Sequence, residues 1–276
     1  MKLLIGVFCI LSGIVALSTL GRSENSTEVL NEVKTPTLDK RSVPVLVELF
    51  TSEGCSSCPR ADELLSKLVK TETIPGVEVV ALGEHVDYWN HLGWTDPYSQ
   101  AEFSRRQEDY SEAFDLDTIY TPQMIVDGSE EFVGGDWNRA RAAIAKAANV
   151  PKARIDLKLT NKADQSQPLN VTIQVTNLPS RTRNDNADLF LAITENNLQT
   201  QVSRGENGGR SLRHSAVVRE LSVLGSIVSK DAAFATEKPI IVSPDWRREN
   251  LRVIAFVQER RTRRVIAIGE IALDTK

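Results

Sequence analysis

The residues best suited to chemistry are two cysteines that lie three positions apart. Cys55 and Cys58 stand in the run Cys-Ser-Ser-Cys-Pro, which ends at Pro59. A pair at this spacing can form a disulfide, exchange it with another thiol, or offer two thiolates to a metal. The chain has 3 cysteines, and the third, Cys9, lies in the apolar N-terminal run. An isolated pair is not a disulfide framework, so it favours chemistry over cross-linking.

The segments on either side of the pair predict a strand, a loop and a helix. The stretch 43–50 is apolar and rich in β-branched residues, as in a buried parallel strand. After the pair, apolar residues recur at helical spacing from Ala61 to Leu68. Cys55 is therefore expected near a helix N-terminus, where unpaired N–H groups and the helix dipole favour a thiolate. Pro59 suits the first helical turn.

Further along the chain, Val77–Leu82 predicts a second apolar strand, which completes a βαβ unit. Met124–Val126 predicts a third strand, Asp127-Gly128 a hairpin turn, and Glu131–Gly135 the strand that pairs with it. Apolar residues at helical spacing over 137–147 indicate a last helix.

This arrangement resembles the thioredoxin fold at two separate places. One is the run from Cys55 to Pro59 between a strand and a helix, and the other is Thr121-Pro122 before a later strand. In that superfamily the proline is cis and packs against the cysteine pair. The resemblance implies that Cys55 is the nucleophile, that Cys58 resolves the mixed disulfide, and that Thr121 and Pro122 position the substrate.

Longer stretches narrow the resemblance to one family. The runs VELFTSEGCSSCPRAD, HVDYWNHLGWTDPYS, YTPQMIVDG and RGENGGRSLRH are together similar to a family of secreted thioredoxin-like proteins, the domain of unknown function 1223. The similarity covers nearly the whole chain after residue 42. It is specific for the family and carries no settled activity.

Several residues are candidates to modulate the pair. His85 and Asp87 follow the second strand, on the side of the sheet where Cys55 follows the first. A His85 imidazolium would lower the pKa of the Cys55 thiol. Alternatively, His85 and Asp87 bond to each other or to the loop and hold Trp89. The hydroxyls of Ser56 and Ser57 could donate hydrogen bonds to a thiolate.

Two glutamates near the pair have open interpretations. The resemblance implies a buried carboxylate on the first strand that exchanges a proton with the second cysteine, and Glu48 is the candidate. The two-residue alternation of strands leaves the face of Glu48 undecided, and an exposed glutamate at the strand end is the alternative. Glu53 is expected on a surface loop, where its charge would oppose a thiolate.

No metal or cofactor is expected. A zinc site needs four ligands, and the chain has no second Cys-x-x-Cys motif and only 3 histidines. The spacing of His85, Asp87, His91 and Asp96 matches no recognised metal motif.

After Pro151 the pattern changes to alternation with a period of two, which predicts antiparallel strands. The predicted fold class is an α/β thioredoxin-like N-terminal domain followed by a separate all-β, sandwich-like domain. The first spans 43–150 with a helical insertion at 90–118, and the second spans 151–276. The loop Arg204–His214 is expected to join the two domains through ion pairs, or to bind an anion.

The first residues predict export. Residues 1–20 combine Lys2 with an apolar run, as in a signal peptide or an N-terminal anchor, and 21–42 reads as a flexible lead-in. The protein is therefore expected in the periplasm or outside the cell, touching a membrane only if this segment is uncleaved. The net charge of −4 gives no indication of a nucleic-acid partner.

Two functions from different classes follow. The first is an exported thiol-disulfide oxidoreductase, whose partners are protein thiols or disulfides and a redox partner protein. The second is a redox-inactive binding or structural module in which the Cys55–Cys58 disulfide is fixed. A metallochaperone that uses the two thiols is a third possibility. The sequence indicates neither the direction of electron flow nor the oligomeric state.

Overall fold

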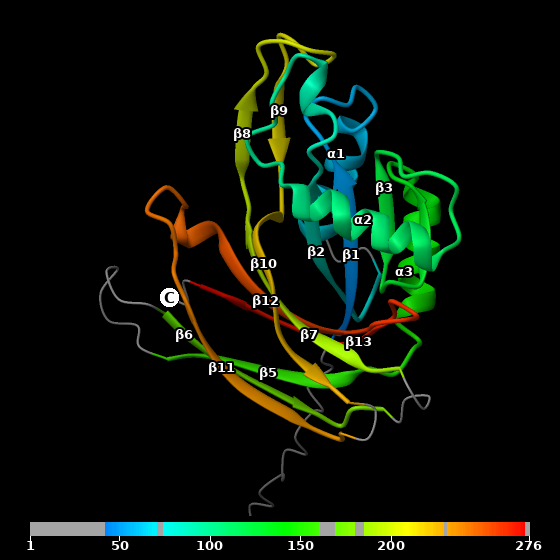
Figure 1. Ribbon diagram of the computed structural model, residues 1–276, viewed down its shortest axis with the longest axis vertical. Helices are drawn as coiled ribbons and strands as arrows, with labels where there is room; N and C mark the ends of the chain where they lie inside the picture. Colours follow the sequence, from blue (N-terminus) through cyan, green and yellow to red (C-terminus); the bar gives the residue numbers. More distant parts are fainter. Residues whose placement is uncertain (1–41, 71–73, 161–168, 180–184, 229–230, 274–276) are drawn as a thin grey trace, which may run out of the picture. The chain divides into compact units, whose positions relative to one another are not determined.

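The computed structural model describes residues 42–70, 74–160, 169–179, 185–228 and 231–273. The expected signal peptide or anchor and all but the last residue of the expected lead-in lie outside these ranges. The described residues fall within one unit, Lys40–Lys276, whose elements are shown in Figure 1. No helix in this described part is long and apolar enough to cross a membrane.

Eleven strands form one mixed sheet in the order β11-β6-β5-β13-β12-β7-β10-β2-β1-β3-β4. Their bounds are β1 Val43–Thr51, β2 Val77–His85, β3 Gln123–Val126, β4 Glu130–Val133, β5 Ala153–Thr160, β6 Leu169–Thr176, β7 Ala187–Glu195, β10 Val217–Ile227, β11 Phe234–Ile240, β12 Leu251–Glu259 and β13 Val265–Ala272. A separate hairpin sheet consists of β8 Leu198–Gln201 and β9 Ser211–His214. The helices are α1 Pro59–Lys70, α2 Ala101–Ala113 and α3 Trp137–Ala147, with short 3₁₀ turns η1 Asn90–Leu92 and η2 Arg248–Asn250.

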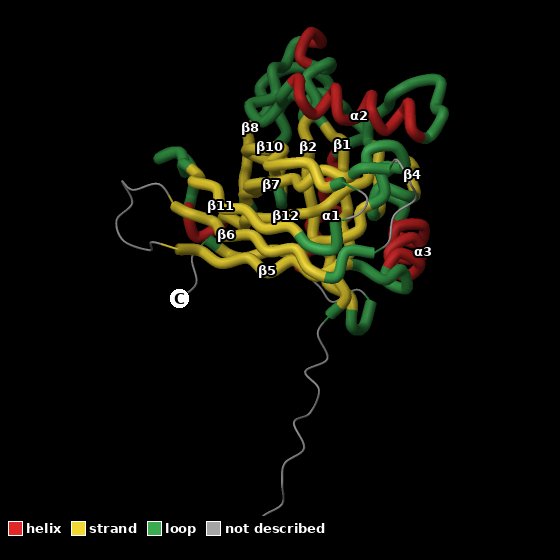
Figure 2. The backbone as a smooth tube through the Cα atoms, turned by 60° about the horizontal axis from the view of Figure 1, so that its bottom comes forward, coloured by secondary structure: helices red, strands yellow, loops and turns green. Residues whose placement is uncertain are grey.

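The predicted fold class is wrong. The protein is not an α/β thioredoxin-like domain followed by a separate all-β, sandwich-like domain, because one sheet runs through both parts (Figure 2). Strand β10 lies parallel to β2 with Val217 opposite Gly83, and the Gly83 N–H donates to the Ala216 carbonyl at 2.7 Å. An edge strand exposes unpaired peptide groups, and near Gly83 the C-terminal half of the chain pairs with this edge of β2.

The hydrophobic core also crosses the expected boundary. On one face of β1, Leu46 and Phe50 belong to the same buried cluster as Val218, Ile254 and Phe256 from the C-terminal half. A separate domain would have enclosed its own apolar side chains, whereas here both halves bury them together.

The local elements were predicted more accurately. Alternate residues of β1 pack on opposite faces, so the strand is buried on both sides, as expected of a central strand. The apolar stripe of α1 from Ala61 to Leu68 is buried, and β3, β4 and α3 occur where the pattern placed them. Helix α2 begins at Ala101, inside the expected helical insertion at 90–118, and Asp96 before it is 2% exposed.

The shared sheet predicts cooperative unfolding of the two halves. With the disulfide intact, we expect far-ultraviolet circular dichroism and tryptophan fluorescence to follow the same urea curve, because no free boundary separates the halves. Tryptophans lie in both halves, for example Trp94 and Trp246. Two resolved transitions would instead show that the halves unfold as independent domains.

Candidate functional site

Cys55 and Cys58 form a disulfide directly before the first residue of α1. Their Cα atoms are 5.4 Å apart, and the Cys58 carbonyl accepts hydrogen bonds from the amides of Ala61 and Asp62 at 2.8 and 3.0 Å. The sulfur of Cys55 lies 3.3 Å from the Ser57 hydroxyl, as the sequence suggested. Cys55 is only 1% exposed and Cys58 is 0% exposed. The pair therefore sits at a helix N-terminus but is covered.

Thr121 and Pro122 are brought to the same side of the protein as the pair. The peptide bond between them is cis, as expected. A Cβ atom built on Gly134 would lie 3.0 Å from the Cβ of Ala61 in α1 and 3.1 Å from that of Pro122. The proline thus packs close to the first turn of the helix that follows the cysteines.

Trp89 links the cysteine loop to Thr121. Its indole N–H donates to the Thr121 hydroxyl at 2.8 Å, and its Cβ lies 3.0 Å from where a Cβ on Gly54 would stand. Gly54 directly precedes Cys55, so one aromatic side chain spans the gap between the two predicted parts of the site. A side chain at Gly54 would displace it.

Ionisable side chains form a buried cluster behind the cysteine loop. Nδ1 of His85 lies 2.7 Å from a carboxylate oxygen of Asp96, which also accepts the Glu53 amide at 2.8 Å. A carboxylate oxygen of Glu53 lies 3.0 Å from Nε2 of His214. The rings of His85 and His214 meet edge to face with centroids 4.8 Å apart. All four residues are at most 3% exposed.

Asp62, in the first turn of α1, is a further member of this cluster. It accepts the Thr51 hydroxyl at 2.9 Å, and its other oxygen lies 3.8 Å from Nδ1 of His214. That nitrogen makes no hydrogen bond within the described part of the chain. Burial raises the pKa of the Asp62 carboxyl, and the nearby charge of His214 opposes the rise. Asp62 is therefore a carboxyl group that can hold a proton one helical turn after Cys58.

His85 and Asp96 each favour the ionised form of the other. Burial opposes the charged imidazolium, but the charge and hydrogen bond of Asp96 outweigh it and raise the pKa of His85. Burial likewise opposes the Asp96 carboxylate, yet His85 and the amides of Glu53 and Tyr98 lower the pKa of Asp96. Both shifts favour the same ion pair.

The structure separates His85 from its expected partner. Asp87 accepts a hydrogen bond from the Ser104 hydroxyl and does not bond to His85. The expectation that Glu53 lies on the surface is also wrong, because it is 1% exposed. Asp62, Asp96 and His214 were missed as parts of one cluster. For Asp62 a signal existed, since it lies three residues before Leu65 and so on the buried face of the helix.

Glu48 lies on the opposite face of the sheet from α1. Its carboxylate accepts hydrogen bonds from Arg106 at 2.8 Å and from the hydroxyl of Tyr110. The Arg106 guanidinium also lies 3.4 Å from Glu84, and burial and the charge of Glu48 raise the pKa of Glu84 well above its ordinary value. Glu48 is thus a buried partner of Arg106, 0% exposed, and the structure does not bring it to the cysteines.

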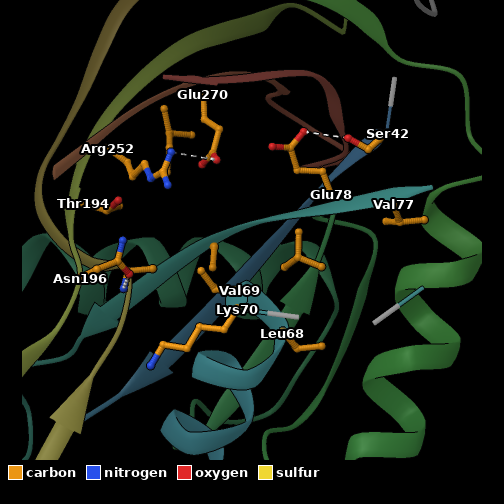
Figure 3. A pocket seen from close by; sticks show the side chains of 14 residues that line it. Ser42, Leu68, Val69, Lys70, Val77, Glu78, Thr194, Asn196, Arg252 and Glu270 are labelled. Carbon is orange, nitrogen blue, oxygen red and sulfur yellow. Dashed lines mark hydrogen bonds and ion pairs between the residues drawn. The ribbon is translucent and has the colours of Figure 1, made fainter. Parts of the chain in front are cut away.

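A cavity of about 510 Å³ opens at the far end of α1 (Figure 3). Leu68 and Lys70 line one side, and Figure 3 shows Arg252 beside Glu270 on the other. Its lining includes none of the residues predicted for the redox site.

Comparisons with known proteins agree with the fold. A family model described as protein of unknown function (DUF1223) matches residues 46–258. The chain is similar to the Agrobacterium tumefaciens protein AGR_C_4864, with 25% identity and a TM-score of 0.64 over 86% of this chain and 97% of that one. It also resembles HBP35 of Porphyromonas gingivalis, with 18% identity and a TM-score of 0.63 over 85% and 76%. That second likeness shows the fold alone. No curated protein matches the chain significantly.

The ion pair predicts how stability depends on pH. The raised pKa of His85 gives a contribution that is fully present below its ordinary value of 6.5 and is lost as the pH rises through the folded value. The lowered pKa of Asp96 gives one that is present above 3.8 and is lost as the pH falls through the folded value. We expect His85→Gln to lower the free energy of unfolding by roughly 3 kcal/mol near pH 5.5, and by less at alkaline pH.

Urea unfolding of both proteins across this pH range checks the prediction. His91→Gln is the control, because His91 is exposed and makes no buried ion pair. A difference between wild type and His85→Gln that stays constant with pH would contradict the assignment of the charged pair.

Proposed function

We propose that this chain, which belongs to the family described as protein of unknown function (DUF1223), is an exported thiol-disulfide oxidoreductase acting through Cys55 and Cys58. The observation that carries the proposal is the disulfide at the start of α1, backed by a buried acid–base cluster. Amide groups at a helix N-terminus and the Ser57 hydroxyl are groups that stabilise a thiolate on Cys55.

The reaction is an exchange of sulfur–sulfur bonds. A thiolate of a reduced partner protein attacks the sulfur of Cys55, the Cys55–Cys58 bond breaks, and Cys58 leaves as a thiolate. A second thiolate of the partner then attacks the partner's own sulfur in the mixed disulfide and releases Cys55. The partner gains a disulfide, and this chain gains two electrons as a dithiol. The same steps run in reverse when the partner is the one to be reduced.

The buried cluster supports the proton transfers that accompany this exchange. The Cys58 thiolate is formed away from water, because Cys58 is 0% exposed, and a proton close by favours its departure. The Asp62 amide bonds to the Cys58 carbonyl, and its carboxyl has a raised pKa. We assign Asp62 as a proton store for Cys58, with His214 and Glu53 connected behind it.

The burial of both sulfurs favours a second candidate, the redox-inactive module. A disulfide with 1% and 0% of its two residues exposed is sealed in this conformation. In such a module the cross-link would fix the loop before α1 and would never exchange. The two candidates differ in one property, which is whether a thiol in solution reaches Cys55 in the folded protein.

Export is part of the proposal. Isolated disulfides persist in oxidising compartments, and the sequence of residues 1–20 has the composition of a signal peptide or anchor. The partners are accordingly protein thiols or disulfides in the periplasm or outside the cell, and a redox protein that restores the pair.

Cysteine variants test the exchange. We expect folded Cys58→Ser to accumulate a mixed disulfide with glutathione at Cys55, because the thiol that would resolve it, Cys58, is gone. Cys55→Ser is the matched control and should form about tenfold less adduct or lower, since the proposal makes Cys58 the resolving thiol and not the thiol that a partner attacks. Intact-mass measurement under native conditions gives the yields. Equal absence of adduct in both variants would support the redox-inactive module.

A further inference from the structure

The tip of the β8–β9 hairpin lies on the cysteine loop. In Figure 1 this hairpin stands beside α1, apart from the large sheet. The side-chain amide of Asn207 donates to the carbonyls of Glu53 and Cys55, at 2.8 and 3.0 Å. The carboxylate of Glu206 accepts the Ser56 amide at 3.0 Å. We call residues Ser203–Arg210 the cap loop.

The cap loop is anchored by few contacts. Within it only Asn207 is buried, at 0% exposure, and the other residues are exposed. Its shape is kept by internal bonds, among them Gly208 N–H to the Gly205 carbonyl and the Arg210 guanidinium to the Asn207 side chain. Gly205 and Gly209 have φ of 77° and 83°, a conformation that suits glycine. The bonds of Glu206 and Asn207 and the packing of Gly205 beside Trp94 hold the loop, and a segment of this kind can detach as a unit.

Glu206 also affects the charge beside Cys55. The Ser56 amide lies in the loop between the two cysteines, and Glu206 accepts its hydrogen bond. The hydrogen bonds from Ser56 lower the pKa of Glu206, so the cap loop holds a carboxylate next to the residue that must carry a thiolate. When the loop leaves, a negative charge departs and an N–H becomes available to the sulfur.

We propose that the cap loop closes the redox site and that Asn207 is the positioning residue that keeps it closed. Opening exposes Cys55 and favours its thiolate in the same movement. The biological meaning of this step rests on the proposed function. A partner that takes the place of the loop must accept a hydrogen bond from Ser56 and donate to the carbonyls of Glu53 and Cys55. The open site therefore fits a segment with neighbouring carboxylate and amide side chains.

Asn207→Ala tests the proposal without any partner protein. We expect the Cys55–Cys58 disulfide to be reduced by tris(2-carboxyethyl)phosphine about tenfold faster or more than in wild type, because the anchoring hydrogen bonds are gone. The matched control is Gln199→Ala, which removes a hydrogen bond to the Ser211 hydroxyl inside the same hairpin but touches neither the cap loop nor the cysteine loop. Circular dichroism establishes that both variants are folded. An unchanged reduction rate in folded Asn207→Ala overturns the proposal.

Hydrogen exchange of wild type gives a second test that needs no variant. The Ser56 amide, bonded to Glu206, should exchange by local opening and much faster than the buried β1 amide of Leu46, which is bonded to Asp127. Exchange of both amides only through global unfolding would contradict an opening loop. If Asn207→Ala opens the site but Cys58→Ser forms no adduct, the cap loop stands and the oxidoreductase proposal falls.

Discussion

The site depends on the pairing of β10 with β2. The bond from Gly83 N–H to the Ala216 carbonyl fixes the segment just before β10 against the edge of β2. A Cβ at Gly83 would stand 3.2 Å from the Ser215 carbonyl oxygen, so glycine permits this close approach. Because the start of β10 is held at β2, the preceding strand β9 places His214 beside Glu53, and the tip of the β8–β9 hairpin contacts the cysteine loop. Without this pairing, the site in the N-terminal half would lack His214 and Asn207.

Strand β1 separates two buried groups of charges. On the face of α2, Arg106 compensates Glu48 and Glu84. On the face of α1, the cluster around His85 and Asp62 lies behind the disulfide. Buried charges stabilise a fold less than apolar side chains of similar size do. The position of the second group behind the disulfide therefore supports a role in proton transfer, since perturbed ionisable groups concentrate at functional sites.

Local features of the fold were readable from the sequence, and the long-range ones were not. The apolar periodicity of β1 and α1 is a property of neighbouring residues, so both elements were placed correctly. The pairing of Val217 with Gly83 joins residues far apart in the chain, and the local sequence of neither segment predicts its partner. The alternation of the strand was compatible with either face for Glu48. In the structure Glu48 lies on the face where Arg106, from α2, pairs with it.

Part of the site was predictable from the sequence. Cys55, Cys58 and Pro122 belong to short motifs, so their place was predictable. The pairing of His85 with Asp96, and not with Asp87, depends on a turn that begins before α2 and points the Asp96 carboxylate inward. Asn207 lies in the loop Arg204–His214, which was expected to join the two halves through ion pairs. Its side chain carries no charge, so this expectation did not include it.

In the proposed mechanism, a covered disulfide at a helix N-terminus is exposed when the cap loop opens, and it then exchanges with a partner. Its central claim is that the pair is redox-active in the folded protein. The reduction potential of Cys55–Cys58, measured by equilibration with glutathione buffers, tests this most directly. The account predicts a value between about −120 and −270 mV, as in exchange-active pairs, whereas a value below about −300 mV, as in structural disulfides, would contradict it.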